Sequence, residues 1–255
     1  MKDEKLYGIH PVLEVLHQKR RRVSRIMLSH QKQSVELQRI RLLAEQQGIP
    51  ISHVEPRELH RLLGHGVHQG VLAFVTPHSY QAWDEVIATL RVRTGLQTVI
   101  ALDGVTDVGN FSALIRAGVA FGGNTIIVPK HASVGLTPTV AKHSAGALEK
   151  VAVVQVTNLV RALEDLKQEG FWAYGADMRA SSTVAQMVWP ERLVLVLGAE
   201  GKGMRRLVKE CCDALIRIPM HAGTDSLNVA VAGAIMLAYR WDHCEAASTL
   251  LPRRL

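Results

Sequence analysis

The chain has few cysteines and no long apolar run. Its 255 residues include three cysteines, Cys211, Cys212 and Cys244, an odd number in which two are adjacent. This arrangement does not fit the disulfide framework of small secreted proteins, so we expect reduced, structural thiols. No stretch of about 18 apolar residues occurs, and the opening MKDEKLYGIH lacks the apolar region of a secretory signal. We therefore expect a cytoplasmic protein without a membrane span.

Patterns for metal binding and for phosphate-binding loops are missing as well. His65 and His68 in HGVH have metal-ligand spacing, but no cysteine or carboxylate stands close by to complete a coordination shell. No GxGxxG or GxxxxGK[ST] pattern follows an apolar strand. Dinucleotide and triphosphate chemistry are therefore disfavoured, and no metal is expected.

The sequence is poor in aromatic side chains and rich in cations. Residues 7–75 contain only two aromatic residues, Tyr7 and Phe74, so a base-stacking platform that reads RNA sequence is not indicated there. The formal net charge is +7 and the pI is about 9.5. An excess of cations attracts polyanions, and nucleic acid is the partner that it favours.

Part of this charge is concentrated in a run of adjacent cations, Lys19, Arg20, Arg21 and Arg22. Arg25 follows shortly after this run. Adjacent cations repel one another, so the run is expected to stay extended and solvated unless phosphates neutralise it. Two interpretations remain open, a contact with the RNA backbone and a plain solvated loop.

Two differently patterned segments divide the chain. Residues 7–75 alternate helical stretches at 11–18, 34–47 and 56–63 with strand-like stretches at 25–29, 49–53 and 70–75. This alternation predicts a small α/β/α sandwich. Residues 77–97 contain a short amphipathic helix at 83–92 and are interpreted as a linker. The predicted domains are thus residues 1–76 and residues 98–255, joined by the linker.

From residue 98 the pattern of strand, glycine-containing turn and helix indicates a larger α/β domain. Its expected strands lie at 99–102, 125–128, 151–156, 172–176, 193–197 and 215–218. Their nearly continuous apolar runs predict a parallel sheet with helices on both faces. Residues 228–240, NVAVAGAIMLAYR, are expected to form an apolar helix. So little polar surface indicates that a subunit interface, as well as the sheet, covers this helix.

Polar residues and glycines follow two of these strands, where a parallel sheet binds its ligands. In LDGVTDVGNFSALIRAG (102–118), the strand is followed by Asp103, Asn110 and Arg116. An arginine in an otherwise apolar helix indicates either a bound anion or a guanidinium that reaches solvent. In LVLVLGAEGKGM (193–204), glycines flank Glu200. These glycines allow the backbone to approach a nucleoside closely, and a plain turn would not require the carboxylate.

A third such segment is IPMHAGTDSLNVAVAGA (218–234), in which a strand leads through a loop into the apolar helix. Asp225 or Ser226 is expected to be the N-cap of that helix, because short oxygen-bearing side chains satisfy its first backbone donors. The same backbone donors also suit a ligand, so this interpretation stays open beside the first.

The segments DGVTDVGNFSALIRA, LVLGAEGKGM and IPMHAGTDSLNVAVA, in this order and spacing, resemble the three motifs of the SpoU (TrmH-type) branch of the SPOUT methyltransferases. The segments YGIHPVLEVL, VHQGVLAFV and HSAGALEKVAV also resemble the 23S rRNA guanosine 2′-O-methyltransferases of that branch. The similarity covers nearly the whole chain, and three ordered motifs are far more specific than any one of them.

The resemblance implies an α/β protein with a trefoil-knotted parallel-sheet domain and a smaller N-terminal α/β/α domain similar to ribosomal protein L30e. The pattern alone favours an unknotted Rossmann-like sheet, because knotted chains are rare. The resemblance further implies a homodimer that uses S-adenosylmethionine, without a metal, to methylate a ribose 2′-hydroxyl in RNA. The substrate that it favours is a guanosine of 23S rRNA, in naked RNA or in a ribosomal particle.

The resemblance also implies roles for individual residues. The expected methyl-donor site consists of Leu197, Gly198, Ala199, Glu200, Gly201, Ile218, Met220, Ser226 and Leu227. The expected catalytic set is Asn110, Arg116, Glu200, Ser226 and Asn228, and the expected RNA contacts are Lys19, Arg20, Arg21, Arg22 and Arg25. Because a guanidinium does not give up its proton in proteins, we interpret Arg116 as a phosphate clamp and electrostatic activator, not as the general base.

One residue departs from the family's motif, and several alternatives stay open. Asp225 stands where small or hydroxylic residues are common, and its carboxylate either weakens phosphate binding or caps the helix. The substrate alternatives are a tRNA ribose and the rRNA site of thiostrepton-resistance enzymes. A non-catalytic ribosome-assembly factor is disfavoured because the catalytic set is retained. A Rossmann-type methyltransferase is disfavoured because no glycine-rich loop follows an early strand.

Overall fold

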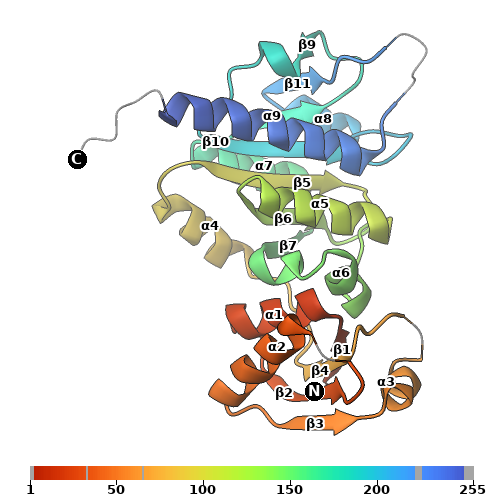
Figure 1. Cartoon of the computed structure of the whole chain (residues 1–255). Helices are drawn as coiled ribbons and strands as arrows, with labels where there is room; N and C mark the ends of the chain where they lie inside the picture. Colours follow the sequence, from red (N-terminus) through yellow and green to blue (C-terminus); the bar gives the residue numbers. More distant parts are fainter. Residues whose placement is uncertain (1–2, 33, 65, 222–225, 250–255) are drawn as a thin grey trace. The chain divides into compact units, whose positions relative to one another are not determined.

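The computed structural model of the chain describes residues 3–32, 34–64, 66–221 and 226–249. The chain forms two compact units, one made of Met1–Ser79 with Gly135–Lys150 and the other of Tyr80–Val134 with Val151–Leu255. Each unit has its own β-sheet (Figure 1). The segment Gly135–Lys150 therefore belongs to the first unit, although it comes from the middle of the chain.

The first unit is built on a four-stranded mixed sheet with the order β1-β4-β2-β3. Strand β4 is antiparallel to β1 and β2, and β3 is parallel to β2. Its elements are β1 Glu4–Tyr7, α1 Ile9–Gln18, β2 Val23–Ser29, α2 Val35–Gln46, β3 Ile51–Val54, α3 Pro56–Leu63, β4 Val71–Val75, α6 Pro138–His143 and the 3-10 helix η1 Ala147–Lys150. The helices and strands predicted between residues 7 and 75 are confirmed. Strand β1 was not predicted, because EKLY offers no alternation long enough to signal a strand.

A buried charged cluster fixes the segment Gly135–Lys150 in this unit. The Arg21 guanidinium donates to Glu149 Oε1 (2.9 Å), to Glu4 Oε2 (3.1 Å) and to the carbonyl oxygen of Thr76 (2.7 Å). The side chains of Arg21 and Glu149 are only 5% and 0% exposed. Because a buried charge is costly unless it is paired, these two residues depend on each other.

A second polar contact holds the same segment. Gln69 Oε1 accepts a hydrogen bond from Lys142 Nζ on α6 (3.1 Å) and another from the backbone N–H of Ile9 (3.1 Å). The Lys142 ammonium also lies 5.6 Å from the centre of the Tyr7 ring. The sequence segments YGIHPV and VHQG thus meet α6 here, and we assign them a structural role in this unit.

The burial of Arg21 leads to a stability prediction. Arg21→Ala should lower the free energy of unfolding by about 3–5 kcal/mol, because it leaves the Glu149 carboxylate buried without its cation. Urea unfolding of the variant and the wild type measures this difference. Arg22→Ala is the matched control, since Arg22 is exposed and its loss should change stability by less than about 0.5 kcal/mol. Equal effects of the two substitutions would contradict the structural role of Arg21.

The second unit is built on a seven-stranded, all-parallel sheet with the order β7-β6-β5-β10-β8-β11-β9. Its elements are α4 Trp83–Val92, β5 Gln97–Asp103, α5 Val108–Ala120, β6 Gly123–Pro129, β7 Ala152–Val156, α7 Leu159–Gln168, β8 Trp172–Ala176, β9 Ser182–Thr183, the 3-10 helix η2 Val184–Gln186, β10 Arg192–Gly198, α8 Arg206–Cys211, β11 Ala214–Arg217 and α9 Val229–Thr249. The parallel sheet, its six predicted strands and the amphipathic helix near residues 83–92 are confirmed.

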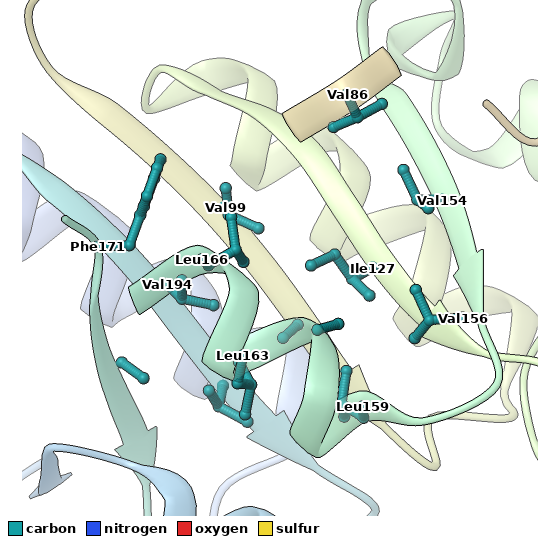
Figure 2. Packing of buried hydrophobic residues seen from close by; sticks show 14 of the residues in the cluster. Val86, Val99, Ile127, Val154, Val156, Leu159, Leu163, Leu166, Phe171 and Val194 are labelled. Atoms are coloured by element: carbon teal, nitrogen blue, oxygen red, sulfur yellow. The ribbon is translucent and has the colours of Figure 1, made fainter. Parts of the chain in front are cut away.

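One face of this sheet packs on α4, α7 and α8. Leu159, Leu163 and Leu166 recur at helical spacing along α7 and point toward the strands (Figure 2). They contact strand residues such as Val99 and Val194. Only every second residue of a strand points to this face of the sheet, because successive side chains point to opposite faces. All seven residues of β5 are buried, which explains its continuous apolar run.

Helices α5 and α9 pack against each other on the opposite face. Arg240 of α9 is 1% exposed, and burial lowers the pKa of its guanidinium to about 10. The guanidinium donates to Thr98 Oγ1 (2.6 Å) and to the backbone oxygens of Gln97 (2.9 Å), Pro190 (3.0 Å) and Glu191 (2.8 Å). These bonds hold the part of α9 around Arg240 at the amino end of the sheet. The first turn of α9 therefore lies at the carboxyl end of the strands. Among the described residues, no helix is long and apolar enough to cross a membrane.

Candidate active site

Two neighbouring cavities open at the carboxyl ends of the parallel strands of the second unit. The larger has a volume of about 770 Å³, within the roughly 300–1,000 Å³ typical of small-molecule sites. All nine residues predicted to bind the methyl donor line it, namely Leu197, Gly198, Ala199, Glu200, Gly201, Ile218, Met220, Ser226 and Leu227. Residues from two distant motifs thus share one cavity, as the sequence predicts.

A tight turn after β10 forms one wall of this cavity. Ala199 and Gly203 exchange two backbone hydrogen bonds, from Ala199 N to Gly203 O (3.1 Å) and from Gly203 N to Ala199 O (2.8 Å). A Cβ atom on Gly198 would lie 2.2 Å from the backbone of Gly203 and Met204, so no other residue fits there without a backbone shift. Gly201 has φ +73°, a conformation that favours glycine. We refer to residues 198–203 as the Glu200 turn.

A buried carboxylate anchors the far end of this turn. Asp103, the last residue of β5, is 2% exposed. It accepts hydrogen bonds from both the backbone N–H and the Nε of Arg205 (2.7 Å each). Because β5 and β10 are paired neighbours, this contact ties the turn to the adjacent strand end.

Asn228 joins the three motifs. Its Nδ2 donates to Glu200 Oε1 (2.6 Å) and to Asn110 Oδ1 (2.8 Å), while its Oδ1 accepts from Ala230 N (2.9 Å) and Val231 N (3.2 Å). The last two bonds make Asn228 the N-cap of α9. The structure thus brings three of the predicted catalytic side chains into contact.

The predicted N-cap of α9 is therefore corrected. Asn228 fills this position in place of Ser226, because the helix begins at Val229, two residues later than a cap at Ser226 requires. Ser226 lines the larger cavity instead. Asp225, the other predicted cap, lies outside the described residues, as does His65.

The second cavity, of about 430 Å³, lies on the other side of the Glu200 turn. Strand ends β5 and β6 and the start of α5 form its walls. Five residues line both cavities, namely Ala199, Glu200, Lys202, Gly203 and Val229. Its titratable lining groups are Asp103, Asp107, His131, Glu200, Lys202 and Arg205. The sequence prediction missed His131, although its place just after a predicted strand is the signal that would have found it.

Arg116 is the predicted catalytic residue that lies apart from the others. It is exposed on α5, nearly two turns beyond Asn110, and lines neither cavity. Within the described part of the chain it makes no hydrogen bond or ion pair. Its guanidinium is thus available to an anion that approaches α5 from solvent.

The basic run divides into one buried and four exposed members. Arg21 lies inside the first unit, bound to Glu149, which argues against an RNA contact from this side chain. The exposed members are Lys19, Arg20, Arg22 and Arg25. Arg25 stacks on Phe74 with its guanidinium carbon 4.0 Å from the ring centre.

Other reactive groups do not form a site in the described residues. No cluster of three or more His, Cys, Asp or Glu side chains is placed there to hold a metal ion. The three cysteines are free thiols, and burial raises the pKa of the Cys212 thiol to about 12. A thiol with such a pKa is a poor nucleophile at neutral pH.

Two family models match the chain. Residues 97–238 match the SpoU rRNA Methylase family, and residues 5–81 match the RNA 2′-O ribose methyltransferase substrate binding family. The first match contains both cavities, and the second contains the basic run.

Individual relatives agree with these matches. A 23S rRNA (guanosine-2′-O-)-methyltransferase RlmB of Pseudomonas putida is 42% identical over 236 residues, which cover 92% of this chain and 94% of the relative. The crystal structure of the SpoU methyltransferase AviRb from Streptomyces viridochromogenes, in complex with AdoMet, aligns with a TM-score of 0.78 at 20% identity and covers 96% of this chain and 92% of that one. The TrmH/SpoU tRNA modifying enzyme of A. aeolicus aligns with a TM-score of 0.53 at 27% identity, over 65% of this chain and 86% of that one.

Proposed function

The chain belongs to the SpoU rRNA methylase family, and from this premise we propose that it transfers a methyl group from S-adenosylmethionine to the ribose 2′-hydroxyl of a guanosine in 23S rRNA. The observation that carries the proposal is the single contact cluster of Asn110, Glu200 and Asn228, one residue from each motif, between the two cavities. The RlmB relative, similar over nearly its whole length, supports the choice of 23S rRNA.

The larger cavity fits a nucleoside-based methyl donor. The absence of a side chain at Gly198 lets the backbone of Gly203 and Met204 pack directly against it, so the Glu200 turn forms a tight backbone wall of the cavity. Leu197, Ile218 and Leu227 add apolar surface, and Glu200 adds a carboxylate. When bound, S-adenosylmethionine supplies a methyl group on a positively charged sulfur. The residues of the chain orient this group, and a transfer of this kind gains mainly from alignment of the reacting atoms.

The catalytic side chains have separate tasks in this proposal. Asn228 holds Glu200 and Asn110 in place, so the wall between the cavities keeps its shape. Ser226 lines the donor cavity together with Glu200 and Asn228. Arg116 clamps a phosphate of the RNA and favours the developing negative charge on the 2′-oxygen, because a guanidinium forms paired, charge-assisted hydrogen bonds with phosphate.

We propose that residues 1–76, together with Gly135–Lys150, capture the RNA, and that catalysis takes place in the second unit, which also contains α4 of the predicted linker 77–97. The match of residues 5–81 to a substrate-binding family supports this division. We further propose a domain similar to ribosomal protein L30e for the first part and a trefoil knot for the second, as in the wider family. The exposed side chains of Val231 and Tyr239 on α9 support a homodimer. A protein that acts on ribosomal RNA is expected in the cytoplasm.

The exposed basic residues supply the RNA-capture prediction. Replacing Lys19, Arg20, Arg22 and Arg25 together by glutamine should weaken RNA binding and flatten its salt dependence, by about 0.7 in the logarithmic slope for each lost phosphate contact. Fluorescence anisotropy with labelled RNA at several salt concentrations measures this slope. Arg161, which is exposed on α7, provides a single-charge control. An unaltered slope would favour the interpretation of the basic run as a solvated loop that does not contact RNA.

Ribose-methylation mapping tests the proposed substrate. We expect one 2′-O-methylguanosine of 23S rRNA to disappear when the protein is removed from cells and to return when purified protein and S-adenosylmethionine are added. Loss of a tRNA methylation instead would favour the activity of the A. aeolicus relative. Binding of the methyl donor without transfer to any RNA would favour a non-catalytic assembly factor.

A further inference from the structure

The proposed reaction requires a proton acceptor that the motif residues do not supply. A ribose 2′-hydroxyl is a weak acid, so a group near it must take up the proton as the new bond forms. The guanidinium of Arg116 does not serve, because arginine stays protonated in proteins. We infer that His131 accepts this proton, an inference that rests on the proposed function.

His131 has the required position. It lies two residues after the end of β6 and lines the second cavity, with Asn110 and Asp107 of the α5 start in the same lining. This cavity shares the Glu200 turn with the donor cavity. The two cavities are therefore adjacent, and a ribose in the second cavity would lie next to a methyl donor in the first.

The carboxylates of the second cavity are already engaged. Asp103 accepts two hydrogen bonds from Arg205, Asp107 caps α5 through Asn110 N (2.7 Å), and Glu200 accepts from Asn228. Each carboxylate is thus held in a structural contact.

The remaining titratable groups leave His131 as the acceptor. The lysine and arginine of this lining, Lys202 and Arg205, are hydrogen-bond donors without an acceptor atom. His131 is exposed, and with the residues that the structure describes it forms no hydrogen bond or ion pair. Histidine is also the side chain that changes charge near neutral pH.

Proton uptake by His131 accompanies the transfer of the methyl group. The 2′-oxygen forms a bond to the methyl carbon while the carbon–sulfur bond breaks, and that electron pair returns to sulfur. The O–H bond breaks and its proton moves to an imidazole nitrogen of His131, which then releases it to water. The products are the methylated ribose and S-adenosylhomocysteine, and no oxidant or metal takes part.

The test is the pH profile of the transfer step. A general base acts in its unprotonated form, so single-turnover methylation by the wild type should rise with pH. His131→Asn should lose this rise and transfer about 10²–10⁴-fold more slowly at pH 8. Its affinity for S-adenosylmethionine by calorimetry should stay within a few fold, which also shows that the variant is folded.

Two further measurements separate acid–base chemistry from a structural role. Added imidazole should restore part of the activity of His131→Gly, and it should not affect the wild type. NMR signals of the His131 imidazole should shift when target RNA and S-adenosylhomocysteine bind, and shift less with RNA that lacks the target 2′-hydroxyl. His143→Asn is the matched control, because His143 is exposed on α6 and lines neither cavity.

The outcomes distinguish this role from the proposed function. If the wild type transfers methyl groups and His131→Asn keeps the same rate and pH profile, the role of His131 is overturned while the function stands. If the wild type binds S-adenosylmethionine but transfers its methyl group to no RNA, the proposed function fails, and the role of His131 fails with it.

Discussion

Gly198→Ala should reduce the affinity for S-adenosylmethionine by at least about 100-fold, equivalent to roughly 3 kcal/mol of binding free energy. The alanine Cβ would lie 2.2 Å from the carbonyl carbon of Gly203 and from the amide nitrogen of Met204. Both are backbone atoms, so no side chain can rotate away and the Glu200 turn itself must move. Overpacking of this kind typically costs about 1–3 kcal/mol, and here the displaced atoms form the wall of the donor cavity.

Gly201→Ala is the matched control in the same turn. Gly201 has φ +73°, but none of the residues that the structure describes lies within 4 Å of the position of its missing Cβ. Its substitution by alanine should cost only the strain of an alanine in the left-handed backbone conformation, about 1–2 kcal/mol. Calorimetry gives the two affinities, and circular dichroism checks that both variants are folded. Comparable affinities in folded Gly198→Ala and wild-type protein would rule out the Glu200 turn as a wall of the donor site.

The second large effect is expected at Arg116. Arg116→Ala should slow methyl transfer by about 10²–10³-fold or more, the usual cost of removing a group that stabilises developing charge. Its affinity for S-adenosylmethionine should stay within a few fold, because Arg116 does not line the donor cavity. The loss should therefore appear in the rate of bound enzyme, measured by single turnover with saturating donor and RNA.

Two substitutions control this experiment. Arg116→Lys should recover only part of the rate, because an ammonium keeps the charge and lacks the planar fork that binds phosphate in pairs. Arg161→Ala removes an exposed cation of α7, outside both cavities, and should transfer at the wild-type rate. Full activity of Arg116→Ala would refute its role in transfer.

The sequence predicted the helices and strands well, and it predicted that residues of two motifs line one cavity, because these features depend on local patterns. Buried parallel strands require apolar runs, and turns such as the one after β10 require glycine. The two motifs that line the larger cavity each follow one of these strands. The rule that ligands bind at strand ends singled out both segments, and the family resemblance placed Gly198 and Leu227 together, as the shared cavity does.

Contacts between distant segments were not predictable from such patterns. In the sequence, Arg21 cannot be told apart from its neighbours in the basic run. In the structure it pairs with Glu149, 128 positions away. A single sequence contains no signal for such a pairing. The cap of α9 was missed for a related reason. Several residues before this helix are good caps, and the choice of Asn228 is fixed by its contacts with Glu200 and Asn110.

The placement of Gly135–Lys150 also limits how the molecule can be dissected or recombined. The chain crosses between its units after Ser79, after Val134 and after Lys150, so no single cut separates them. A truncation that begins at Tyr80 would retain Glu149 and lose Arg21, its cation. A modular exchange of the substrate-binding half with another enzyme would therefore have to transplant two pieces of chain together.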